Sequence, residues 1–195
     1  MRLIKIIIIV TILPFYAKGQ PLPMFKAHGD SIVGLTAERE QQMKAALHIF
    51  ELVMNDTAFQ RALLNTKFVF DVPNDPNINL STLQIVSKIY AGKEFYKPME
   101  DNVANVHWII VKKRRPIFTR HPALGEGAED GVEIFTYTWF FDSGDIAEIT
   151  GHIAHEWSHK IGFEHAFHPH PGRDDTVPYA FGYLVRDFAK KYISN

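Results

Sequence analysis

HEWSHKIGFEH, residues 155–165, gathers three histidines, a glutamate and a glycine into one short stretch. A helix signal runs over residues 146–160, with Asp145 as the expected N-cap, so His155 and His159 lie at i and i+4 on one helix face. That spacing lets two imidazole rings reach a single metal ion. The stretch therefore predicts a helix that presents a pair of metal ligands.

Gly162 and His165 complete the predicted metal site. Gly162 is expected to take a left-handed conformation and turn the chain back, which brings His165 to the metal as a third ligand. Three protein ligands leave a coordination position open for water, as is typical of catalytic zinc. Glu156 is the candidate general base, because a carboxylate beside the first ligand can take a proton from water and pass it to a leaving amine. A chain of this composition matches the whole pattern by chance roughly once in 10⁴ cases.

The chain has 10 histidines, so the others must be weighed against this motif. His152 lies near the same helix face, but a fourth histidine ligand would close the open coordination position. His168 and His170 fall in a proline-rich stretch, where surface histidines are the default. We assign structural or surface roles to His28, His48, His107 and His121.

Length and composition limit the possible functions. With 195 residues, of which 46% are apolar, the chain is expected to form one domain over residues 20–195. A net charge of −1 provides no overall field that would attract nucleic acid, so a polypeptide or a small neutral substrate fits better. The absence of cysteine excludes disulfides, thiolate metal sites and a cysteine nucleophile.

The first residues, MRLIKIIIIVTILPFYAKG, have the pattern of a signal peptide. Basic residues precede an apolar run over residues 6–16, and small residues stand at the expected cleavage site after Gly19. A membrane span needs about 20 apolar residues, so we expect cleavage at residues 1–19 and no stable membrane insertion. The mature protein is predicted to be secreted or periplasmic.

The remaining segments predict a mixture of helices and strands, and hence an α+β fold. Residues 20–34 carry prolines and glycines and indicate an irregular lead-in, and residues 116–131 indicate a long surface loop. Helices are expected at 36–54, 57–64, 81–90 and 180–193, and strands at 67–72 (KFVFDV), 103–111 and 132–141.

The pattern at residues 155–165 resembles the long zinc-binding consensus of the metzincin clan of metallopeptidases. The resemblance implies a twisted mixed sheet with backing helices, an active-site helix and a C-terminal helix. It makes His155, His159 and His165 zinc ligands and Glu156 the general base. It also implies an edge strand before the active-site helix, here residues 132–141, that pairs with an extended substrate.

The chain departs from metzincins after the third histidine. Metzincins have a methionine beneath the metal, but no methionine follows Met99, and TVPYAFG (residues 176–182) takes that place as a turn before the last helix. This resembles uncharacterised metzincin-like secreted bacterial proteins with a V-P-Y turn. Two roles are open for Tyr179: packing under the metal, or pointing its hydroxyl at the site to stabilise an oxyanion.

The expected function is therefore a secreted zinc-dependent metalloendopeptidase that acts as a monomer on polypeptide substrates. The alternative is a catalytically inactive module in which Zn²⁺ stabilises the same fold for binding a partner. Glu156 favours catalysis, because a site kept only for its metal has no need of it.

Overall fold

The computed structural model describes residues 22–34, 36–115, 124–127, 131–143 and 145–193. The predicted signal peptide at residues 1–19 lies outside these ranges. None of the described helices is both long and apolar enough to cross a membrane. The elements follow one another as β1 (Lys26–Val33), α1 (Ala37–Asn55), α2 (Thr57–Leu64), α3 (Thr82–Ala91), β2 (Val103–Val111), β3 (Gly125–Gly127), β4 (Glu133–Tyr137), α4 (Thr138–Phe141), α5 (Ile146–Lys160), the 3₁₀ helix η1 (Arg173–Asp175) and α6 (Val177–Ile193).

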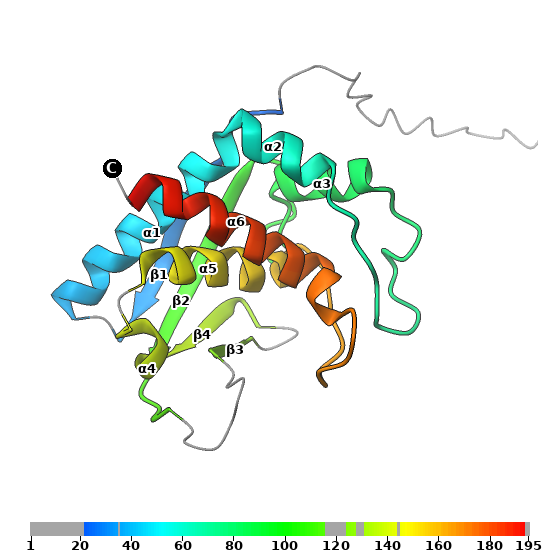
Figure 1. The fold of residues 1–195 in the computed structure, drawn as a ribbon. Coiled ribbons are helices and arrows are strands. Elements are labelled where there is room, and N and C mark those ends of the chain that lie inside the picture. The colour runs from blue at the N-terminus through cyan, green and yellow to red at the C-terminus, as the bar shows by residue number, and fades with distance from the viewer. Residues whose placement is uncertain (1–21, 35, 116–123, 128–130, 144, 194–195) are drawn as a thin grey trace, which may run out of the picture.

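The described strands form one mixed sheet in the order β1-β2-β4-β3. Strands β1, β2 and β4 are parallel, and β3 pairs antiparallel with β4. The register sets Trp108 on β2 beside Ile134 on β4. The α+β class and the mixed sheet are thus confirmed (Figure 1).

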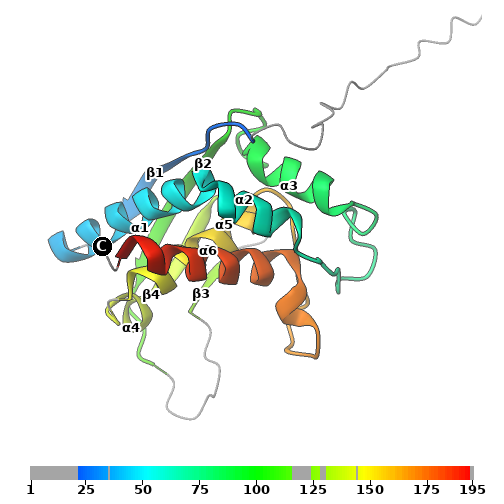
Figure 2. The same ribbon diagram turned by 45° about the horizontal axis from the view of Figure 1, so that its top comes forward.

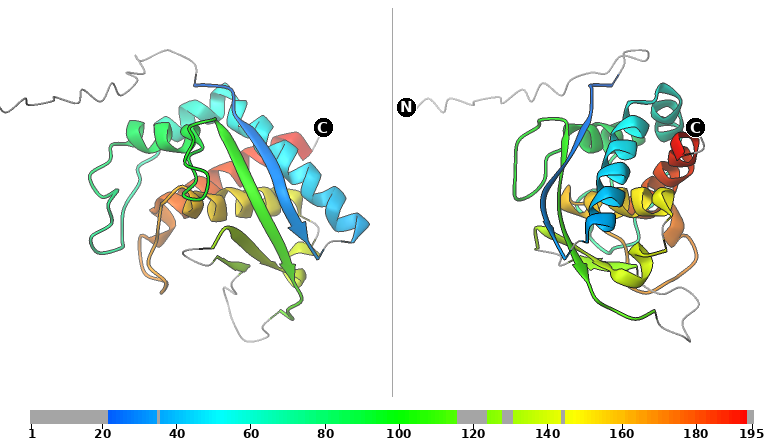
Figure 3. Two further views of the ribbon diagram at one scale, coloured as in Figure 1. Left: turned by 180° about the vertical axis from the view of Figure 1, so that it is seen from behind. Right: turned by 90° about the vertical axis from the view of Figure 1, so that its left-hand side faces the viewer.

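The long helices gather on one face of this sheet. Helices α1, α5 and α6 lie in front of the strands in Figure 1, and the view from behind in Figure 3 exposes the strands instead. Figure 2 shows α6 beside α1 and α2, with which it is in contact. On the covered face, Trp108 and Ile110 of β2 alternate with the less buried His107, Ile109 and Val111, as a strand packed on one side requires.

Aromatic rings fill the space between the sheet and the helices. Phe25 packs edge-to-face on Trp157 of α5 at 5.6 Å between ring centroids, and Phe50 of α1 contacts both Trp157 and Phe181 of α6. All four side chains are fully buried. The tryptophan inside the histidine motif therefore anchors α5 in the core, while the histidines emerge from another side of the same helix.

The structure confirms the bounds of several predicted elements and shows the capping residues at the ends of two helices. Strand β2 and helix α5 have the predicted bounds, and the predicted helices at 36–54, 57–64 and 81–90 are α1, α2 and α3 within one residue at each end. The Asp145 carboxylate accepts hydrogen bonds from the N–H groups of Ala147 and Glu148 at 2.9 and 3.3 Å. Ser81 and Gln84 form a capping box on α3, and Gly92 ends that helix with φ 65°.

Three of the strand and loop predictions are wrong. Residues 26–33, expected as irregular lead-in, form β1, because pairing with β2 compensates for poor local propensity and the register shifts between Gly29 and Ser31. Residues 67–72 form no strand; Val69 makes only an isolated bridge to Thr176. The predicted loop at 116–131 contains β3 among its described residues.

Two further corrections concern the surroundings of α5. The strand predicted over 132–141 ends at Tyr137, after which the chain forms α4, and β3 rather than β4 lies at the edge of the described sheet. The last helix begins at Val177, so the V-P-Y sequence forms its first turn instead of a preceding turn. Proline is tolerated there because the first N–H groups of a helix have no intrahelical acceptor.

Candidate metal centre

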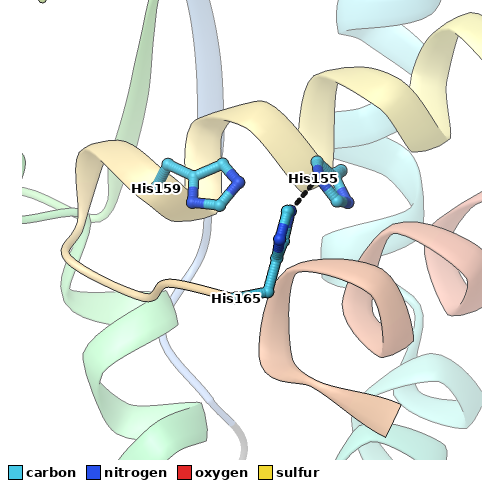
Figure 4. Close-up of side chains that lie close together, drawn as sticks. All are labelled: His155, His159 and His165. Atoms are coloured by element: carbon cyan, nitrogen blue, oxygen red, sulfur yellow. Dashed lines mark hydrogen bonds between the residues drawn. The ribbon is translucent and has the colours of Figure 1, made fainter. Parts of the chain in front are cut away.

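The structure brings His155, His159 and His165 together. One ligand nitrogen of each histidine lies within 4.8 Å of the other two, and the Nε2 atoms of His155 and His165 are 3.3 Å apart. His155 and His159 project from α5, and His165 comes back toward them from the chain after the helix (Figure 4). This is the group that the sequence predicts, and it is the only group of three or more potential ligands among the described residues.

The distances and hydrogen bonds of these histidines suit a bound metal ion. Tetrahedral zinc with Zn–N bonds of about 2.0–2.1 Å holds its nitrogens about 3.3 Å apart, as His155 and His165 are. The Nδ1 atom of His159 lies 2.7 Å from the Phe163 carbonyl oxygen, and that of His165 lies 3.1 Å from the Ala166 carbonyl oxygen. Because a carbonyl only accepts, the neutral ring of His159 carries its proton on Nδ1 and leaves the Nε2 lone pair for a metal. Nδ1 of His165 faces both the Ala166 carbonyl and, at 3.4 Å, the Arg173 guanidinium, which only donates.

Residues from another part of the chain hold the turn that follows α5 and leads to His165. Gly162 has φ 82°, the left-handed conformation expected from the sequence. Its carbonyl oxygen accepts a hydrogen bond from the Asn77 amide at 2.7 Å, and Lys88 donates to the other end of that amide at 2.8 Å. The segment between α2 and α3 thus fixes the direction in which the chain leaves α5.

Burial favours the neutral form of two of the three histidines, the form that could bind a metal. The pKa of His155 is well below its ordinary value, first because the ring is buried and then because His159 and His165 repel a charge on it. The pKa of His165 is lowered by burial and by His159. For His159 burial acts in the same direction, but contact with Glu164 and the charge of Glu156 outweigh it and raise the pKa. A metal must therefore displace a proton mainly from His159.

Tyr179 packs directly under two of the histidines. Its ring centroid lies 4.5 Å from that of His155 and 4.7 Å from that of His165, and the Arg173 guanidinium stacks on it at 4.7 Å. Burial raises the pKa of the Tyr179 phenol, so the hydroxyl stays protonated at neutral pH. Among the described residues its hydroxyl makes no hydrogen bond. The packing role is visible in these contacts, and the oxyanion role stays a prediction.

Glu156 is buried on α5, with 9% of its surface exposed, in contact with His152. Its Oε1 lies 3.6 Å from Nδ1 of His152, whose Nε2 lies 2.9 Å from the Thr136 hydroxyl. Burial lowers the pKa of His152, although the Glu156 charge opposes it. His152 therefore faces the sheet and the glutamate, outside the three-histidine group.

Asp71 is a residue of this region that the sequence did not single out. Its carboxylate accepts a hydrogen bond from the Ala166 N–H at 2.8 Å, next to the third histidine, and lies 2.7 Å from Nε2 of His170. Asp71 therefore fixes the chain just beyond His165. His168 and His170 are exposed, as expected. Only a contact across the fold reveals Asp71, since nothing near it in the sequence suggests a ligand-supporting role.

Comparisons with protein-family models, with curated proteins and with solved structures find no match for this chain.

Proposed function

We propose that this protein is a secreted zinc-dependent metalloendopeptidase with a metzincin-like site. The observation that carries the proposal is the convergence of the three histidine nitrogens next to a buried glutamate on the same helix. His155, His159 and His165 would hold the metal. Bound Zn²⁺ supplies Lewis acidity, which lowers the pKa of a coordinated water toward about 7 and polarises a carbonyl.

The side chains of the protein then move the protons. Glu156 takes a proton from the attacking water and delivers it to the leaving nitrogen of the cleaved peptide bond. Tyr179 supports the rings of His155 and His165 from below, and its hydroxyl is a candidate donor to the developing oxyanion. The signal-peptide pattern supports an extracellular or periplasmic protein.

The substrate proposed is an extended polypeptide. An edge strand offers unpaired backbone groups to such a chain, and β3 takes this position in the described sheet, with β4 behind it. Pairing of this kind recognises the peptide backbone and selects weakly among sequences. A denatured protein is therefore a suitable first substrate.

The proposal is tested on the mature protein with metal analysis and cleavage of a denatured protein. We expect one zinc per chain, turnover that a chelator abolishes, and recovery when zinc is restored. Glu156→Gln should keep the zinc and lower turnover by about 10²–10⁴-fold. Glu148→Gln is the matched control, because Glu148 lies about two turns before Glu156 on the same helix and its exposed carboxylate pairs with Arg186 at 3.7 Å. Its turnover should stay within a few-fold of the wild type.

Two results would contradict the proposal. Stoichiometric zinc without cleavage of any of several denatured proteins would favour the inactive binding module. Full turnover in Glu156→Gln would remove the glutamate from the mechanism.

A further inference from the structure

We propose that His152 is a positioning residue that aims a proton donor at Glu156 and so holds its carboxylate in place for proton transfer. This inference rests on the proposed role of Glu156 as general base. It concerns a histidine that is outside the metal-ligand group, and two residues of the sheet, Thr136 and Trp108, that tie this histidine down.

A series of buried contacts leads from the sheet to α5. The indole N–H of Trp108 on β2 donates to the Thr136 hydroxyl oxygen on β4 at 2.7 Å. That oxygen lies 2.9 Å from Nε2 of His152, and Nδ1 of His152 lies 3.6 Å from Oε1 of Glu156. Trp108 and Thr136 have no exposed surface, and His152 is 5% exposed. Water therefore does not compete for these groups.

The direction of each hydrogen bond follows from the chemistry of the donors. An indole nitrogen can only donate, so the Thr136 oxygen accepts from Trp108. The Thr136 hydroxyl proton then has one acceptor among the described residues, Nε2 of His152. A neutral imidazole that accepts at Nε2 carries its proton on Nδ1, the nitrogen that faces Glu156.

The ring of His152 is also fixed sterically. It packs against Phe140 at 5.2 Å and against Trp108 at 6.0 Å between ring centroids. The gap of 3.6 Å to Glu156 is longer than a hydrogen bond, and a shift of about 0.6 Å in the carboxylate brings it to an ordinary length. A donor held still beside a carboxylate restricts the orientations from which that carboxylate can take a proton.

Two substitutions of His152 distinguish the role of its Nδ1 atom from that of its Nε2 atom. The amide of His152→Asn reaches about as far as Nδ1, so it can still donate to Glu156, whereas the amide of His152→Gln reaches about as far as Nε2 and contacts Thr136 instead. We expect kcat within about 3-fold of wild type for Asn and a loss of about 10- to 100-fold for Gln. KM and zinc content should be unchanged in both variants. Equal kcat losses in the two variants, or a loss confined to KM, would overturn the proposal.

Thr136 supplies a second pair of variants at the other end of the chain of contacts. Thr136→Ser keeps the hydroxyl and should keep kcat, while the isosteric Thr136→Val removes it and should lower kcat without releasing zinc. If Val and Ser behave alike, Thr136 does not orient the histidine and the proposal fails.

NMR of the zinc-loaded protein with ¹⁵N-labelled histidine gives a readout independent of turnover. The proposal requires a neutral His152 ring with its proton on Nδ1 and a change in that signal in Glu156→Gln. A proton on Nε2 alone would overturn it even in an active enzyme. The protein could also give the expected NMR result and bind zinc but cleave no substrate. That outcome would uphold the contact between His152 and Glu156 and reject the peptidase proposal.

Discussion

Replacing Gly182 by alanine tests the close packing of α6 against the helix that carries the first two histidines. A Cβ at Gly182 would lie 2.9 Å from the Gly151 carbonyl oxygen and 3.0 Å from the His155 Cβ, and ordinary contacts begin at 3.4 Å. The helices must therefore separate by about 0.5 Å, an overpacking that costs about 1–3 kcal/mol. The higher helix propensity of alanine offsets this cost by about 1 kcal/mol in the free energy of unfolding. We expect a net loss of about 1 kcal/mol, which lowers Tm by about 2–4 °C.

Gly151→Ala is the matched control for the effect on the metal site. Its Cβ would meet the Arg186 Cβ at 2.7 Å and the Gly182 carbonyl oxygen at 2.8 Å, at the same helix crossing but away from the histidine. Both variants should therefore lose stability in thermal unfolding followed by circular dichroism. Calorimetric titration of the metal-free proteins should show zinc affinity reduced by about 10-fold in Gly182→Ala and much less in Gly151→Ala.

Two outcomes would refute this reasoning. An increase in Tm in both variants, as alanine gives in an open helix, would mean that α5 and α6 do not approach so closely. Equal losses of zinc affinity would mean that contact with His155 is not what matters at Gly182.

Two further predictions concern groups that brace the site. Trp157→Phe removes the indole N–H that donates to the buried Glu94 carboxylate at 2.9 Å, so chemical denaturation should show a loss of about 1–3 kcal/mol. Contacts with the Pro171 carbonyl and the Asp71 carboxylate raise the pKa of His170 above 6.5. The stability that the protonated imidazole adds through these contacts is therefore complete below pH 6.5, and it is lost as pH rises through the raised pKa. Tm should accordingly fall more steeply above pH 6.5 in the wild type than in His170→Gln, and parallel curves would exclude the contact.

The helices of this protein could be predicted from sequence because their signals are local. The Asp145 cap, the periodic apolar positions and Gly162 all lie within or next to α5, and they define its bounds and its exit turn. The three metal-ligand candidates were predictable for the same reason, since i,i+4 spacing and one left-handed glycine fix their relative positions.

The strands were harder to predict because pairing partners decide them. Residues 26–33 include glycine and aspartate, which disfavour strands locally, yet they pair with β2 along most of its length. The apolar run at residues 67–72 has the alternation of a strand but finds only one bridging partner, Val69 to Thr176. At 138–141 the aromatic run continues past the last paired residue of β4 and coils into α4.

The residues that support the candidate site could not be predicted from the sequence. Thr136, Trp108 and Asp71 are ordinary strand or loop residues in the sequence, and their contacts arise only when elements distant along the chain come together. Helical spacing places His152 near the same face of α5 as His155, but its partners on the sheet do not follow from that spacing.

All three metal-ligand candidates lie between residues 155 and 165, and this has a thermodynamic consequence for the unfolded chain. Closing so short a loop around an ion would cost little conformational entropy, so the denatured protein would keep an appreciable affinity for a metal that binds the native site. An ion that binds both states stabilises the native one only by the difference in affinity. The metal would thus contribute less to holding the domain together than ligands spread across the chain would.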